Sequence, residues 1–129
     1  MLKQIKTFKG NALALELVEQ FTEADAQLIK QLFDEKLNAG YEHVNLLIKV
    51  KDMSVLRHMD LKAFLEGEIW GLKHFGKIGR CAVVAHSDLI KAVVRIENKA
   101  LHLANAAFEE KYFDTEQLDE ALNFLCPDE

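Results

Sequence analysis

The sequence predicts an α/β protein with a mostly parallel five-stranded sheet, one antiparallel edge strand and helices mainly on one side of the sheet. Three observations favour this fold. Short segments that alternate apolar and polar residues, as strands do, recur between longer segments with helical periodicity. The first two strands follow each other without a helix, which is typical of a hairpin, whereas the later strands alternate with helices and therefore pair in parallel. Most strands are apolar on one face only, which favours helices on that side.

The first two strands are predicted at residues 2–8 and 12–19. The first segment is rich in lysine, which discourages pairing with other chains and is typical of an edge strand. Gly10 and Asn11 form the turn between the two segments. The second segment places leucine at every other position, so one face of this strand belongs to the core.

A helix is predicted over residues 22–39, with Thr22 as its N-cap and Gly40 as its stop. Glu23 and Asp25 lie in its first turn, where the helix dipole favours negative charge. The helix has a single apolar stripe, which indicates an ordinary core helix. The stripe consists of Leu28, Ile29, Leu32, Phe33 and Leu37.

Residues 44–50 are predicted to form a strand with one core face and one face that is at least partly wet. Asp60 is the predicted N-cap of the next helix, which runs to about Phe75. That helix has a core-facing apolar stripe and, roughly opposite, a second face of small residues around Trp70. Glu68 lies inside the apolar stripe, where a carboxylate without a partner would be costly. We therefore expect a further element or a ligand to cover this helix.

A short apolar strand inside the sheet is predicted at residues 80–86, and Asp88 is the predicted cap of a helix that runs to residue 104. The apolar residues of this helix cover about 200° of the helical wheel, more than the roughly 100° that packing on one core requires. Glu97 lies inside this arc. The arc consists of Leu89, Ile90, Ala92, Val93, Val94, Ile96, Ala100, Leu101, Leu103 and Ala104.

The last strand is predicted at residues 107–113, and Thr115 is predicted to cap a final helix that ends at Pro127. The resulting order of elements is β-β-α-β-α-β-α-β-α. No linker, repeat or low-complexity segment interrupts this order. We therefore expect a single domain over residues 1–129.

Composition and charge restrict the classes of function. The net charge of −5 argues against nucleic acid as a partner, because phosphate binding needs clustered Lys and Arg. The sequence shows no secretory leader and no run of about 18 apolar residues that could span a bilayer. Cys81 and Cys126 show no Cys-x-x-Cys spacing and are expected to be reduced thiols in a cytoplasmic protein. No metal-ligand spacing is present, so we expect no metal and no cofactor.

Four segments, taken together in this order, are characteristic of a known family. They are Leu72-Lys73-His74-Phe75, Arg80-Cys81-Ala82-Val83-Val84, Phe108-Glu109-Glu110-Lys111-Tyr112-Phe113 and Leu118-Asp119-Glu120-Ala121-Leu122-Asn123-Phe124-Leu125. With these segments the chain resembles the small bacterial SpoIIAA-like proteins over essentially its whole length. The resemblance implies the fold shared by STAS domains, which are anti-sigma-factor antagonists, and by the CRAL-TRIO carriers of hydrophobic compounds.

The resemblance to STAS antagonists also implies a phosphorylatable serine in a short turn at the start of the helix after the third strand. In this chain that region covers residues 51–56, with Ser54 as its one serine and with no glycine. Asp60 stands at the expected helix cap, where a serine would be required. Ser54 therefore belongs to an alternative hypothesis only.

The apolar surplus of the helices at 60–75 and 88–104 predicts a site for a hydrophobic or amphipathic small ligand, with peripheral contact to the inner membrane. An empty apolar cleft is unfavourable in water, so these helices are expected to open and close. The same surplus could instead pack inside the monomer or form a homodimer. The candidate ligand-binding residues are Met53, Leu56, Met59, Phe64, Gly67, Glu68, Trp70, Gly71, Val93, Ile96 and Glu97.

The alternative hypothesis is a STAS-type protein-interaction and signalling module that a phosphate at Ser54 would switch. We do not expect an enzyme. The five histidines share no helical or strand spacing typical of a metal site. The best single candidate for a catalytic base is His86, which lies at the C-terminal end of a predicted strand, where open α/β sheets bind ligands.

Overall fold

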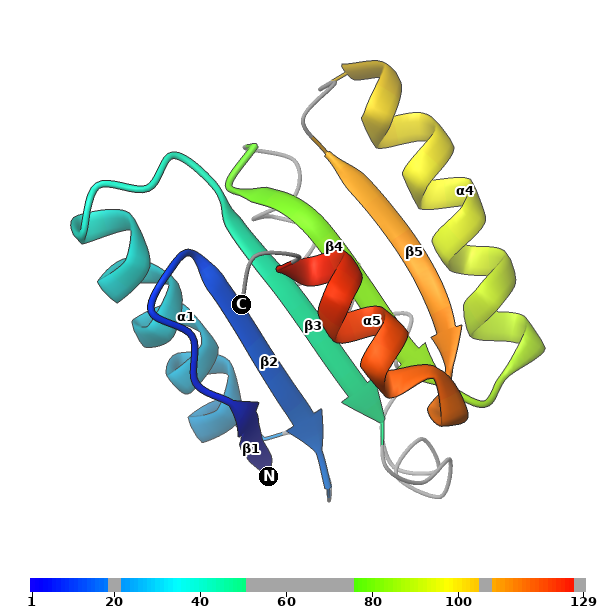
Figure 1. The fold of residues 1–129 in the computed structure, drawn as a ribbon, viewed down its shortest axis with the longest axis horizontal. Coiled ribbons are helices and arrows are strands. Elements are labelled where there is room, and N and C mark those ends of the chain that lie inside the picture. The colour runs from blue at the N-terminus through cyan, green and yellow to red at the C-terminus, as the bar shows by residue number, and fades with distance from the viewer. Residues whose placement is uncertain (19–21, 51–75, 105–107, 127–129) are drawn as a thin grey trace.

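The computed structural model describes residues 1–18, 22–50, 76–104 and 108–126. Five strands form one sheet whose spatial order equals the chain order (Figure 1). The strands are β1 (Leu2–Lys6), β2 (Ala12–Leu17), β3 (Val44–Val50), β4 (Ile78–Ala85) and β5 (Glu109–Asp114). β1 pairs antiparallel with β2, and all other pairs are parallel. The predicted mostly parallel sheet with an antiparallel edge strand is confirmed, and β4 is an interior strand as predicted.

Helices cover both faces of the sheet, but mainly one. α1 (Glu23–Asn38) and α4 (Asp88–Ala104) pack on the larger core, while α5 (Leu118–Leu125) packs on a smaller core on the opposite face (Figure 1). The prediction that helices lie mainly on one side therefore holds for the described helices. The helix predicted over residues 60–75, with its cap Asp60, lies outside the described residues.

The alternating side chains of β3 serve both cores. The larger core receives Val44, Leu46, Ile48 and Val50, each at most 2% exposed. On the other face Leu47 is fully buried under α5. Lys49 lies on that same face and is half-buried, with its Nζ 3.2 Å from the carboxylate of Glu16 on β2. The second face is therefore partly wet beyond the cover of α5, as predicted.

α1 begins at the predicted cap. The backbone N–H of Asp25 donates to the Thr22 hydroxyl at 3.3 Å, and the Asp25 carboxylate accepts from the Thr22 backbone N–H at 2.9 Å. This is a capping box. The Asp25 carboxylate also accepts from the Leu2 backbone N–H at 3.1 Å and lies 3.1 Å from the Met1 amine. One carboxylate therefore joins the start of α1 to the edge strand.

Two hydrogen bonds attach the C-terminal end of α5 to the sheet, and a third, between β4 and β3, positions the Asn45 side chain. The Asn45 side chain on β3 donates to the Leu125 carbonyl at 3.0 Å and accepts from the Arg80 backbone N–H at 2.9 Å. The Arg80 guanidinium on β4 donates to the Phe124 carbonyl at 2.8 Å. The last carbonyls of a helix have no partner within the helix, so these bonds both satisfy them and hold α5 on the sheet.

Two predicted helix caps are wrong. The Ser87 hydroxyl accepts from the Ile90 backbone N–H at 3.3 Å, so Ser87 is the cap of α4 and Asp88 is its first residue. Asp88 still lies where the helix dipole favours a carboxylate. Thr115 starts a short 3-10 turn (Thr115–Gln117) that precedes α5. The Gln117 side chain accepts from the Asp114 backbone N–H at 3.0 Å, so Asp114 is the cap of this turn, and the N-cap of α5 itself is Gln117, two residues after the predicted one.

Candidate functional site

Most of the predicted ligand-binding residues lie outside the described residues. These are Met53, Leu56, Met59, Phe64, Gly67, Glu68, Trp70 and Gly71, together with the alternative phosphorylation residue Ser54. Val93 and Glu97 belong to the described backbone of α4, but their side chains are outside the description. Ile96 is the one predicted site residue whose side chain is placed. It lies on the surface of α4, 70% exposed.

α4 carries an exposed row of apolar residues on the side that faces away from the core. Ile90 and Val94 are buried against the sheet. Ile96 and Leu103 are 70% and 87% exposed, and at 100° per residue they lie on one side of the helix with two exposed alanines. We call this row the apolar stripe; it consists of Ala92, Ile96, Ala100 and Leu103. Part of the surplus predicted for this helix therefore lies on the surface.

A row of cations runs beside the apolar stripe on the same helix. Lys91, Arg95 and Lys99 are spaced four residues apart, so they lie one above another along α4. They line a groove of about 430 Å³ between α4 and β5. We call it the α4–β5 groove; its other lining residues are Val94, Asn98, Glu110, Lys111 and Tyr112. Sequence analysis did not identify these cations, although their spacing was readable from the sequence.

Two side chains of α4 attach this helix to the strand at the outer edge of the sheet. β5 is the last strand in the sheet order. The Asn98 side chain accepts from the Glu110 backbone N–H at 2.7 Å, and His102 Nδ1 lies 2.7 Å from the Phe108 carbonyl. Since a carbonyl only accepts, Nδ1 of His102 is the donor in that contact. α4 therefore covers part of the edge of β5, a common protection of edge strands.

A second cluster lies at the C-terminal ends of β4 and β5, where His86 was predicted as the best catalytic candidate. The Tyr112 hydroxyl donates to the Ala85 carbonyl at 2.8 Å and accepts from the Ser87 backbone N–H at 2.9 Å. Burial is the largest cause that raises the pKa of Tyr112 above its usual value. His86 Nδ1 lies 3.8 Å from the Asp114 carboxylate. These residues border a pocket of about 220 Å³.

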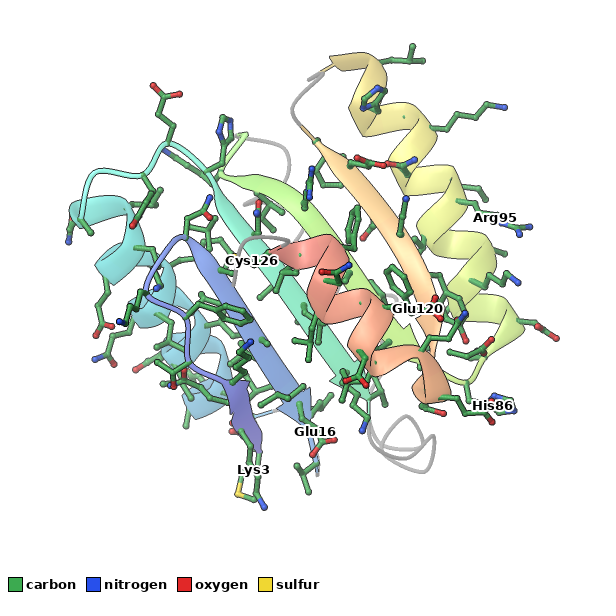
Figure 2. All side chains as sticks on the ribbon, viewed as in Figure 1. Lys3, Glu16, His86, Arg95, Glu120 and Cys126 are labelled. Atoms are coloured by element: carbon green, nitrogen blue, oxygen red, sulfur yellow. The ribbon has the colours of Figure 1, made fainter. Side chains whose placement is uncertain are left out.

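The hydrogen bonds of this second cluster connect β5 to the end of β4 and to the turn before α4. The Tyr112 hydroxyl is engaged on both sides, and the raised pKa keeps it protonated at neutral pH. The side chain of His86 is 85% exposed and points away from the sheet in Figure 2. Within the described residues, no group of three or more His, Cys, Asp and Glu side chains could hold a metal ion. The cluster therefore fixes the turn that leads into α4.

In the described part of the chain, no helix is both long enough and apolar enough to cross a bilayer.

Comparisons with known proteins agree with the fold. The family model described as SpoIIAA-like matches residues 12–126. A crystal structure of an uncharacterized protein with a SpoIIAA-like fold from Shewanella loihica PV-4 is similar at a TM-score of 0.59 and 23% sequence identity, covering 98% of this chain and 93% of that one. No curated protein matches the chain. The family match covers most of the chain and confirms the resemblance drawn from its segments, so the chain belongs to the SpoIIAA-like family.

Proposed function

We propose that this protein is a non-enzymatic STAS-type interaction module that binds a partner protein through the apolar stripe of α4. The observation that supports this proposal is the exposure of two large aliphatic side chains, Ile96 and Leu103, on one side of a single helix. Membership of the SpoIIAA-like family favours a module of this type. The cations beside the stripe supply the polar rim that surrounds the apolar centre of many protein interfaces.

The apolar stripe is large enough to form the apolar centre of a protein–protein interface. Full burial of one leucine or isoleucine side chain contributes roughly 1.5–3 kcal/mol. Two such residues, about two helical turns apart, form the kind of central cluster on which binding energy concentrates. The two alanines of the stripe, Ala92 and Ala100, allow another backbone to approach the helix closely. We therefore expect the partner to place apolar side chains over Ile96 and Leu103.

Site-specific photo-crosslinking tests this proposal. The photoreactive residue benzoylphenylalanine replaces Leu103 in one variant and Tyr41 in a matched control, because Tyr41 is also an exposed large apolar residue but lies after α1. After irradiation in the source cells, we expect a discrete protein adduct from position 103 that is absent from position 41. The adduct should disappear when Ile96→Asp is added. Equal adducts from both positions would contradict the proposal.

A second candidate function is the binding of a hydrophobic or amphipathic small molecule, with peripheral contact to the inner membrane from the cytoplasm. One observation favours it: on α4 a cationic row lies directly beside an apolar stripe, as in helices that lie at a lipid surface. In this proposal the helix predicted at 60–75 and α4 form the site and move apart to admit the ligand. The ligand-binding residues predicted between positions 53 and 71 lie outside the described residues and remain predictions for this second function.

Native mass spectrometry and vesicle co-sedimentation separate the two functions. A carrier should retain an amphipathic molecule after purification and should sediment with phosphatidylglycerol vesicles more than with phosphatidylcholine vesicles. Hydrogen exchange should slow in α4 when the ligand is added. A chain that carries no small molecule and sediments with neither kind of vesicle would exclude this second function. A mass of twice that of the chain would show that a second copy of the chain covers the stripe.

A further inference from the structure

We propose that the α4–β5 groove binds a short acidic segment of the partner protein. This inference rests on the proposed function, because it names the chemistry of the partner that meets α4. Its basis is the local charge of the groove. The whole chain has a net charge of −5, yet α4 presents Lys91, Arg95 and Lys99 in one row at the groove.

The positive charge of the groove is available to a ligand. Among the described residues, none of the three α4 cations takes part in a salt bridge. Arg95 and Lys99 are exposed, and Arg95 projects outward from α4 in Figure 2. Lys91 lies deeper, with its Nζ 6.0 Å from the centre of the Tyr112 ring. Among the described lining residues the one carboxylate belongs to Glu110, which is 2% exposed and therefore buried beneath the rim.

The dimensions of the groove fit a short peptide. Residues 91 and 99 of a helix are about 12 Å apart along its axis. An extended peptide rises about 3.3 Å per residue, so about four residues span that distance. Consecutive cations are about 6 Å apart along the helix, and side chains on one face of an extended peptide are about 6.7 Å apart. An acidic segment can therefore pair with more than one cation at once.

The shape of the site favours a peptide over a membrane. The cations line a concave groove whose wall is the edge strand β5, with Asn98 and Tyr112 among its lining residues. A bilayer surface is flat on this scale and would meet the rim of the groove but not its floor. A peptide can enter the groove and use both its charges and its backbone groups.

Fluorescence anisotropy with fluorescein-labelled pentaglutamate tests the proposal, with labelled pentaglutamine as the uncharged comparison. We expect pentaglutamate to bind and pentaglutamine not to bind. The dissociation constant should rise between 50 and 200 mM salt, because the contacts are exposed and screened. The double variant Arg95→Glu with Lys99→Glu should raise it about fivefold, since each exposed ion pair contributes roughly 1.4- to 5-fold and the two contributions multiply.

A matched control variant separates the groove from the overall charge. Lys3→Glu with Lys30→Glu changes the net charge by the same amount at exposed positions on β1 and α1. It should leave the binding of pentaglutamate nearly unchanged. Equal losses in the two double variants would overturn the proposal. So would a groove-dependent binding of phosphatidylglycerol vesicles without any binding of pentaglutamate, because it would assign the cations to lipid.

The failure of this inference is distinguishable from the failure of the proposed function. Ile96→Asp should abolish the protein adduct from position 103 but should leave the affinity for pentaglutamate within about twofold, because Ile96 does not line the groove. If the adduct forms and pentaglutamate does not bind, the protein-binding function stands and the acidic segment is excluded.

Discussion

α1 and α4 pack on the same face of one sheet, but they use their apolar residues differently. Every large apolar residue of the α1 stripe is buried or packed against the core, with Ile29 and Phe33 almost fully buried. α4 buries Ile90 and Val94 in the same core and leaves Ile96 and Leu103 in water. A single stripe is sufficient to hold a helix on a sheet. The second stripe of α4 therefore does not serve the described core, which is why we assign it to binding.

The largest expected effect on stability comes from the buried apolar residues of α1. Phe33→Ala removes a side chain that is 1% exposed in the larger core. We expect it to lower the free energy of unfolding by about 3–5 kcal/mol, because it leaves a cavity. Ile96→Ala on α4 should cost about 0.5 kcal/mol or less, since exposed positions contribute little. Urea denaturation of both variants is the measurement. If Ile96→Ala lowered the free energy of unfolding by several kcal/mol, Ile96 would belong to the core and the contrast between α1 and α4 would be wrong.

The next effect concerns the start of α1 and depends on pH. Burial alone would raise the pKa of Asp25, but hydrogen bonds from Thr22 and the Met1 amine lower it below its ordinary value of 3.8. A lowered pKa in the folded state means that the carboxylate stabilises the fold above the unfolded pKa. This stabilisation is lost as the pH falls through the folded pKa. Stability from this source should therefore be constant above about pH 5 and decrease below about pH 4.

Asp25→Asn isolates this contribution. We expect it to cost about 1–3 kcal/mol at pH 7, because a buried charged acceptor with several donors is replaced by a neutral amide. The cost should shrink as the pH falls through the lowered pKa of Asp25 in the folded state, because the wild-type carboxylate then becomes protonated as well. Urea midpoints at a series of pH values give the result, with the exposed Asp34→Asn as the control. A cost that does not change with pH would mean that the charge of Asp25 is irrelevant.

A smaller effect is expected at the start of α4. Ser87→Ala removes the hydroxyl that accepts from the Ile90 backbone N–H. We expect a loss of about 1 kcal/mol, as for other helix caps. Ser87→Asn keeps an acceptor at the cap and should restore most of the stability. Helical circular dichroism during urea unfolding measures both. If Asp88→Ala had the larger cost, the cap originally predicted from the sequence would be the true one.

Local signals in the sequence were sufficient for most of the fold. Alternation placed the strands to within about two residues, and the Thr22 cap followed from the residue type alone. The missed features depend on residues that are distant in the chain. Asp25 binds Leu2, which is 23 positions away, and Asn45 binds Leu125, which is 80 positions away. A pattern within one element contains no information about such partners.

The candidate site was predictable to a smaller degree. The apolar surplus of the helix at 88–104 was visible on a helical wheel and led to Ile96. It did not select Leu103, which is the more exposed of the two at 87%. A wheel shows that a helix has too many apolar residues, but the position of the sheet decides which of them remain in water. The cations at the α4–β5 groove acquire meaning only when β5 is placed beside α4.

The smallest expected effect on stability is the most informative one for function. Leu103→Lys replaces an exposed leucine near the end of α4 with a good helix former, so the free energy of unfolding should change by less than about 0.5 kcal/mol. Sedimentation velocity at several concentrations should show the same monomer for the variant and the wild-type chain. A photo-adduct formed by benzoylphenylalanine placed at position 96 should nevertheless be lost when Leu103→Lys is added. Unchanged stability together with the loss of the adduct would show that the apolar stripe serves binding while the buried residues of α4 serve the core. A shift from dimer to monomer would instead show that a second copy of the chain covers the apolar stripe.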